Sequence, residues 1–98
     1  MSNDNRLEIH LDQDRNCFRA NVDGHDCLLE FSRDSAVIVM TSVRVPEAVG
    51  GRGIAGELTR HALDWTRSHG LKVDPVCPYV RTWIQRHPDY QDLLLTGN

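Results

Sequence analysis

The chain has 98 residues, of which 40% are hydrophobic and 26% charged, with a formal net charge of −3. This length suits one domain, residues 1–98, that buries its own core. The acidic balance argues against nucleic-acid binding, and the lack of a long apolar run argues against a membrane span or a secretion signal. The three cysteines are odd in number and lack C-x-x-C spacing, which argues against disulfides or a zinc site. We therefore expect a cytoplasmic protein with no metal ion and no membrane association.

The first half of the chain alternates between apolar and polar residues, as half-buried strands do. The expected strands are 7–11, 18–22, 27–31 and 36–45. Asp23-Gly24 is a hairpin signal between the second and third strands, and a further turn is expected at 32–35. The last strand opens with five apolar residues, 36–40, which predicts that both of its faces are covered.

The second half of the chain changes to a helical period. Its apolar residues Ile54, Leu58, Ala62 and Trp65 fall on one face of a helix that should end near Gly70. A short strand at 71–76 and a helix at 80–86 should follow. The resulting order, β-β-β-β-α-β-α, predicts an α/β (α+β) fold in which the fifth strand lies beside the fourth and parallel to it.

A glycine-rich loop, Gly50-Gly51-Arg52-Gly53-Ile54-Ala55-Gly56, precedes the first helix. Glycines let backbone approach an anion closely, and the N–H groups at a helix start bind it. The G-x-G-x-x-G spacing of a dinucleotide site is present, but the intervening residues 46–49 and the hairpin-built sheet argue against that fold. Glu57-Leu58 stands where a phosphate-binding Walker loop needs Lys-Ser or Lys-Thr. An anion site and a flexible connection remain the two alternatives.

Two motifs in the segment 43–94 carry a family resemblance. The loop from Gly50 to Ala55 is similar to the Q/R-x-x-G-x-G/A signature of the GNAT acetyltransferase superfamily, with Gly50 in place of Gln or Arg. Cys77-Pro78-Tyr79-Val80, followed by His87-Pro88, is the more distinctive marker. The segment resembles the small GNAT-like N-acetyltransferase domain proteins, a pared-down branch of that superfamily. Ser42 departs from relatives that often carry a histidine there.

The resemblance implies a mixed sheet that splays between the fourth and fifth strands, with acetyl-coenzyme A in this cleft. Its pantetheine arm would bond to backbone near Val43 and Val45. The diphosphate would lie on the glycine loop, at Gly51, Arg52, Gly53, Ile54, Ala55 and Gly56. Arg52 would add a charge-assisted contact to phosphate or would remain a solvated arginine.

Cys77 is the candidate catalytic residue. Proline favours the first helical position, so Pro78 would put Cys77 at the N-cap, where the helix dipole favours the nucleophilic thiolate. Three roles stay open for Cys77: it accepts the acetyl group, lines the pocket, or is an inert core residue. The implied function is acetyl transfer to an amine of a small molecule or protein, directly or through Cys77. The alternative is a non-catalytic module that binds coenzyme A, an acyl-coenzyme A or a protein partner.

Overall fold

The computed structural model describes residues 7–95 of the chain. The strands are β1 (His10–Asp12), β2 (Cys17–Val22), β3 (His25–Asp34), β4 (Val37–Arg44) and β5 (Lys72–Pro75). The helices are α1 (Ile54–Ser68) and α2 (Pro78–Gln85), and the short 3-10 helices are η1 (Glu47–Val49) and η2 (Pro88–Leu93). Setting the 3-10 helices aside, this is the predicted order, β-β-β-β-α-β-α.

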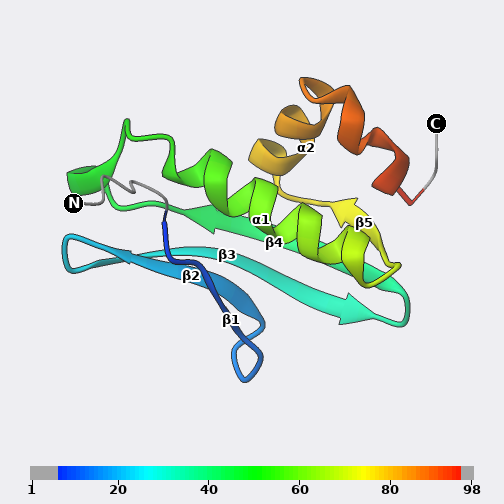
Figure 1. Ribbon diagram of the computed structural model, residues 1–98, viewed down its shortest axis with the longest axis horizontal. Helices are drawn as coiled ribbons and strands as arrows, with labels where there is room; N and C mark the ends of the chain where they lie inside the picture. Colours follow the sequence, from blue (N-terminus) through cyan, green and yellow to red (C-terminus); the bar gives the residue numbers. More distant parts are fainter. Residues whose placement is uncertain (1–6, 96–98) are drawn as a thin grey trace, which may run out of the picture.

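The strands form one mixed sheet in the order β1-β2-β3-β4-β5 (Figure 1). The first four strands pair antiparallel with their neighbours, and β5 pairs parallel with β4. The predicted hairpin turn joins β2 to β3, where Asp23 and Gly24 have φ values of 51° and 83°. Positive φ at both central residues matches the right-handed twist of the paired strands, which is why the Asp-Gly pair predicted this turn.

Several boundaries differ from the sequence prediction. Strand β1 begins at His10, and the preceding Leu7 and Ile9 pack against the core from outside the strand. Strand β3 runs through the turn expected at 32–35 because its last residues pair with the start of β4, and the chain reverses at Ser35 instead, with φ 56°. Strand β4 ends at Arg44. Helix α2 starts at Pro78, two residues early, because proline is well suited to a first helical turn.

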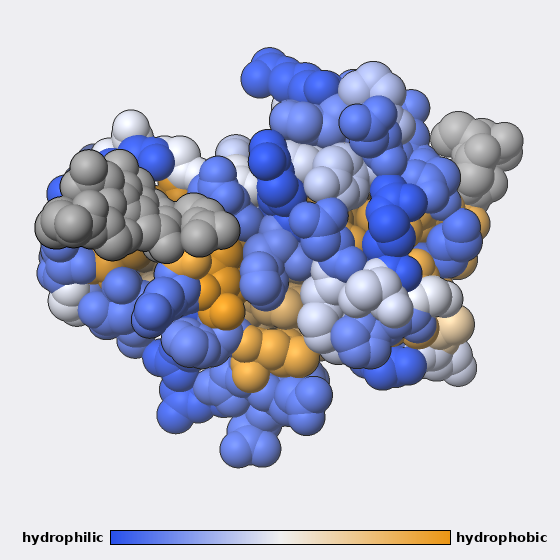
Figure 2. Space-filling model, in the orientation of Figure 1, coloured by the Kyte–Doolittle hydropathy of each residue, from blue (hydrophilic) through white to orange (hydrophobic). Residues whose placement is uncertain are grey.

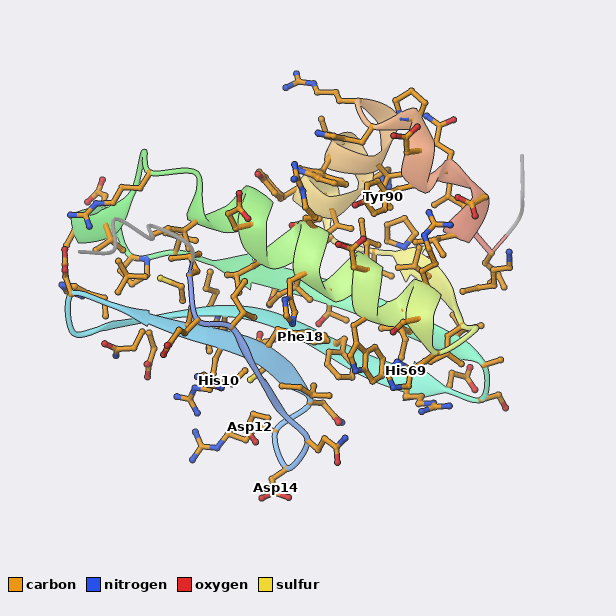
Figure 3. All side chains as sticks on the ribbon, in the orientation of Figure 1. His10, Asp12, Asp14, Phe18, His69 and Tyr90 are labelled. Carbon is orange, nitrogen blue, oxygen red and sulfur yellow. The ribbon has the colours of Figure 1, made fainter. Side chains whose placement is uncertain are left out.

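Helix α1 lies across the sheet with its predicted apolar face inward (Figure 1). Ile54, Leu58 and Ala62 are buried in the core. Trp65 is half-buried and stands edge-on to Phe18 of β2, with ring centroids 5.7 Å apart. Figure 3 shows Phe18 between α1 and the sheet. Aromatic burial of this kind supplies much of the packing energy of a small core.

Both helices pack on the same face of the sheet. Helix α2 contributes Val80, Trp83 and Ile84 to the core cluster that α1 also enters. The segment after α2 returns beside β5 in parallel, at the Val73–Leu94 bridge. Successive right-handed crossovers that move in the same direction across a sheet place their helices on one side. The prediction that β4 is covered on both faces is therefore wrong: Val37 and Val39, on the other face, are only half-buried.

The helix side of the molecule presents a mostly hydrophilic surface, interrupted by a narrow apolar strip in the region of β1 (Figure 2). Leu7, Ile9 and Leu11 are the partly buried apolar residues of that segment. Among residues 7–95, neither helix is long and apolar enough to cross a membrane.

Candidate functional site

Strand β4 continues beyond the point at which its pairing with β5 ends. The parallel pairs run from Val37–Lys72 to Met40–Pro75, whereas β4 extends to Arg44. The backbone N–H of Cys77 closes this ladder by donating to the Met40 carbonyl oxygen at 2.9 Å. From Thr41 onward, the β5 side of β4 has no strand beside it among the described residues.

A β-bulge sits at the point where β4 separates from β5. Phe31 pairs with Met40 and Glu30 pairs with Ser42, which leaves Thr41 as the extra residue on β4. A bulge shifts the alternation of side chains by one residue and bends the strand. At this place, therefore, the side chains of β4 exchange the faces on which they lie, and β4 loses its pairing with β5.

The bulge turns the odd-numbered side chains of β4 toward the helices. Ile38 and Met40 enter the core before it, and Val43 and Val45 pack against the same core after it. Residues of one strand that share a face direct their backbone polar groups to the same edge. The Met40 carbonyl points to the β5 side, so the backbone groups of Val43 point to that side too, past the end of β5. Val45 follows directly after the strand.

The glycine loop forms an open helix start. Gly51 and Gly53 have φ values of 79° and 77°, in the left-handed region that glycine tolerates best. Gly53 is the N-cap of α1 and supplies no capping side chain, so N–H groups of the first turn lack a side-chain partner. A Cβ added at Gly51 or Gly53 would meet no atom within 4 Å. The loop therefore leaves space in front of backbone donors at the positive end of the helix dipole.

Arg52 of this loop is paired with an acidic residue from another element. Its Nη1 atom lies 2.8 Å from Oδ2 of Asp23, at the turn between β2 and β3. Both side chains are at least half exposed, at 51% and 65%. No pattern in the sequence linked these residues, because they lie 29 positions apart in two separate turns.

Cys77 occupies the predicted N-cap of α2, with Pro78 in the first turn. Its side chain is only 6% exposed and belongs to the core cluster, on the helix side of the sheet. It makes no side-chain capping bond. Its backbone link to Met40 fixes Cys77 beside the end of the β4–β5 ladder.

Tyr79 lies beside the glycine loop, and no role was predicted for it although it belongs to the Cys-Pro-Tyr-Val motif. A Cβ added at Gly56 would lie 3.5 Å from its hydroxyl oxygen and 3.6 Å from Nε1 of Trp83. Gly56 thus brings α2 close to the first turn of α1. The Tyr79 hydroxyl therefore lies beside the glycine loop, and the residue as a whole is 43% exposed. Its position two residues after the N-cap Cys77 was the available signal.

A further group of polar side chains lies away from the glycine loop and Cys77. His10, Asp12 and Asp14 gather at β1 and the turn that follows it (Figure 3). Within residues 7–95, no group of three or more His, Cys, Asp or Glu side chains is placed to hold a metal ion.

A mixed sheet in which β4 extends beyond its parallel pairing with β5, with a glycine-rich helix start next in the chain, is typical of GNAT acetyltransferase folds. The family model for GCN5-related N-acetyl-transferases matches residues 17–93, and the chain belongs to this family.

Individual relatives agree with this assignment. The chain is 30% identical over 95 residues to Protein NATD1 of Danio rerio, covering 92% of this chain and 86% of that protein. It is 29% identical over 85 residues to Protein NATD1 of Gallus gallus, covering 84% and 77%. The solution structure of a GCN5-like protein from Staphylococcus aureus has the same fold, with a TM-score of 0.72, 22% identity, and coverage of 93% and 90%.

Proposed function

We propose that this protein binds acetyl-coenzyme A beside the free edge of β4 and transfers the acetyl group to an amine. The observation that carries the proposal is the early end of the β4–β5 ladder at Met40 and Pro75. Among residues 7–95, no strand then lies on the β5 side of the last residues of β4, which precede the glycine loop and α1 in the chain. The amide-rich pantetheine arm is a chemical match for such an edge, and Val43 and Val45 are the residues that would bond to it.

The glycine loop supports a diphosphate at the other end of the proposed binding path from β4 to α1. The uncapped N–H groups of Ile54, Ala55 and Gly56 would donate to phosphate oxygens, aided by the helix dipole. Gly51 and Gly53 would allow close approach, since no side chain or neighbouring atom fills the space before them. Arg52 would exchange the Asp23 carboxylate for a phosphate, a contact of similar geometry and charge.

Two routes are open for the acetyl group. In the direct route, the amine nitrogen bonds to the acetyl carbon as the bond to the coenzyme A sulfur breaks. In the covalent route, the Cys77 thiolate forms a thioester with the acetyl group, coenzyme A leaves as its thiolate, and the amine then displaces Cys77. Cys77 is positioned beside the opening but is largely enclosed, so its thiol would be reached through the opening between β4 and β5.

An intact-mass experiment tests the proposal. The purified protein is incubated with acetyl-coenzyme A, first alone and then with a panel of primary amines. We expect acetylated amine and free coenzyme A, and an acetyl adduct on the protein if the covalent route operates. Coenzyme A binding without any transfer favours the alternative, a non-catalytic binding module. Failure to bind coenzyme A contradicts both.

The acceptor is a small-molecule or protein amine. The loops around the opening are short and would enclose only a small part of a bound acceptor. This favours an acceptor that stays largely exposed to solvent when it binds. The cytosol is the compartment we propose, because the three cysteines are buried, free thiols and a reducing compartment keeps them so.

A further inference from the structure

Ser42 and Glu30 form a polar pair beside the opening. The Ser42 hydroxyl donates to Oε1 of Glu30 over 2.5 Å, a short, charge-assisted hydrogen bond. The two residues are direct cross-strand partners next to the bulge at Thr41. Neither side chain of the pair belongs to the hydrophobic core.

The pair lies on the face of the sheet that carries no helix. The chain neighbours Leu29 and Val43 face the core, so Glu30 and Ser42 face the opposite side. The Glu30 side chain is 39% exposed, and its described contacts with Ser42 Oγ and Arg44 Nε are both made by Oε1. On the helix side, by contrast, Cys77 is only 6% exposed and packs in the core cluster.

The pair also lies at the reactive end of the proposed binding path. If residues 51–56 hold the diphosphate and Val43 holds the pantetheine arm, the thioester reaches β4 near Thr41 and Ser42. An acceptor that approaches from the face without helices would reach the thioester there. It then meets the Ser42 hydroxyl and the Glu30 carboxylate.

We propose that Ser42 and Glu30 accept the proton that the acceptor amine must lose before it attacks, an inference that rests on the proposed function. An ammonium group has no lone pair, so its proton passes to Ser42 Oγ while the Ser42 proton passes to Glu30. The freed lone pair bonds to the acetyl carbon, and the carbon–sulfur bond breaks with its electrons on sulfur. The second amine proton neutralises that thiolate, and Glu30 returns its proton to water.

The charged and titratable groups around Glu30 suit this role. Arg44 of β4 places Nε 3.9 Å from Oε1 of Glu30. Cys17 of β2 is the other cross-strand partner of Glu30, and burial raises the pKa of its thiol, which keeps that neighbour uncharged. Helices α1 and α2 lie on the opposite side of the sheet.

The test compares two amines of different basicity with acetyl-coenzyme A as donor. n-Butylamine is an ammonium ion at neutral pH and needs a proton acceptor, whereas p-anisidine is already neutral. For Glu30→Gln, we expect kcat/KM with n-butylamine to fall about 100-fold. The pH profile of kcat/KM should also lose the part that comes from the Glu30 carboxylate. The fall with p-anisidine should be much smaller. Ser42→Ala should show the same selectivity, and Glu30→Asp should recover part of the rate.

Matched controls and a binding assay separate the possible failures. Ser32→Ala and Asp26→Asn change residues on the same face of the sheet and should leave both rates unchanged. Coenzyme A affinity should stay unchanged in every variant. Equal rates for Glu30→Gln and the wild type, or equal losses with the two amines, overturn the inference and leave the proposed function standing. Coenzyme A binding without transfer to either amine overturns the inference and the transferase proposal together. Absent binding overturns the proposed function itself.

Discussion

Arg52 in the glycine loop and Asp23 in the β2–β3 turn form an ion pair, with 2.8 Å between Nη1 and Oδ2. The pair ties a hairpin at one end of the sheet to the helix start that we propose as the diphosphate site. Exposed pairs of this kind add little to stability, about 0–1 kcal/mol. Its importance lies in competition, because carboxylate and phosphate are alternative partners for the same guanidinium.

Replacing Arg52 and replacing Asp23 should change coenzyme A affinity in opposite directions. Arg52→Ala should weaken binding about tenfold through loss of one charge-assisted contact, and should also reduce the salt dependence of binding. Asp23→Asn should strengthen binding by a few-fold, since it frees the guanidinium. Calorimetry at two salt concentrations measures both effects. Arg33→Ala, an exposed arginine in β3, is the control, and equal affinities for Arg52→Ala and Arg33→Ala contradict the assignment.

The glycines of the loop should differ sharply in their tolerance of alanine. Gly53→Ala should cost about 1–2 kcal/mol of stability, because its φ of 77° is strained for an L-residue. Gly56→Ala should raise the free energy of unfolding by up to about 1 kcal/mol, since this helical glycine has ordinary contact distances of 3.5 and 3.6 Å around its added Cβ. Chemical denaturation measures both.

Gly70→Ala is the matched control for Gly53→Ala. Gly70 also has a positive φ, 67°, and open space around its Cβ, but it lies at the other end of α1. Its alanine variant should lose similar stability and keep its coenzyme A affinity, whereas Gly53→Ala should lose both. Retained affinity in Gly53→Ala would argue that the loop does not hold the diphosphate.

Cys77 can be tested through the mass of the protein. If the covalent route operates, wild-type protein treated with acetyl-coenzyme A gains one acetyl group, and Cys77→Ser does not. Cys17→Ser is the control, since Cys17 is another buried thiol but lies at the start of β2. Full transfer to an amine by Cys77→Ser, with no adduct on the wild type, would assign the direct route.

The ion pair between Arg67 and Asp92 should produce a pH-dependent contribution to stability. Hydrogen bonding to Arg67 at 2.8 and 3.0 Å holds the pKa of Asp92 below its ordinary value of 3.8. Because the folded pKa is lowered, this stability is present above the unfolded pKa and is lost as pH falls through the folded one. Asp92→Asn should therefore lower Tm at neutral pH and converge with the wild type in strong acid. A constant difference in Tm across that range contradicts this reading.

Local signals in the sequence predicted the parts of the site that depend on a few consecutive residues. The glycine-rich loop before the first helix, the helix face that begins at Ile54 and the N-cap at Cys77 each follow from the preferences of neighbouring residues. The same holds for the Asp23–Gly24 turn. Family resemblance added the order of these parts around the opening.

Features that depend on how distant strands align could not be predicted from the sequence. The bulge at Thr41 exists because β3 and β4 change register between Glu30 and Phe31. That change creates the Ser42–Glu30 contact and turns Val43 toward the core. Similarly, the apolar residues of β4 suggested coverage on both faces, yet helix placement depends on crossover direction, which composition does not encode.

The most direct test of the proposed coenzyme A site is a titration of ¹⁵N-labelled protein with coenzyme A, followed by amide NMR shifts. We expect the largest changes at Gly51–Gly56 and at Val43 and Val45, with β1 unaffected. Shifts confined to the cavity of about 440 Å³ at the outer edge of β5, which includes Val73, Ile84 and Leu94, would contradict this prediction. So would the absence of any shift at saturating coenzyme A.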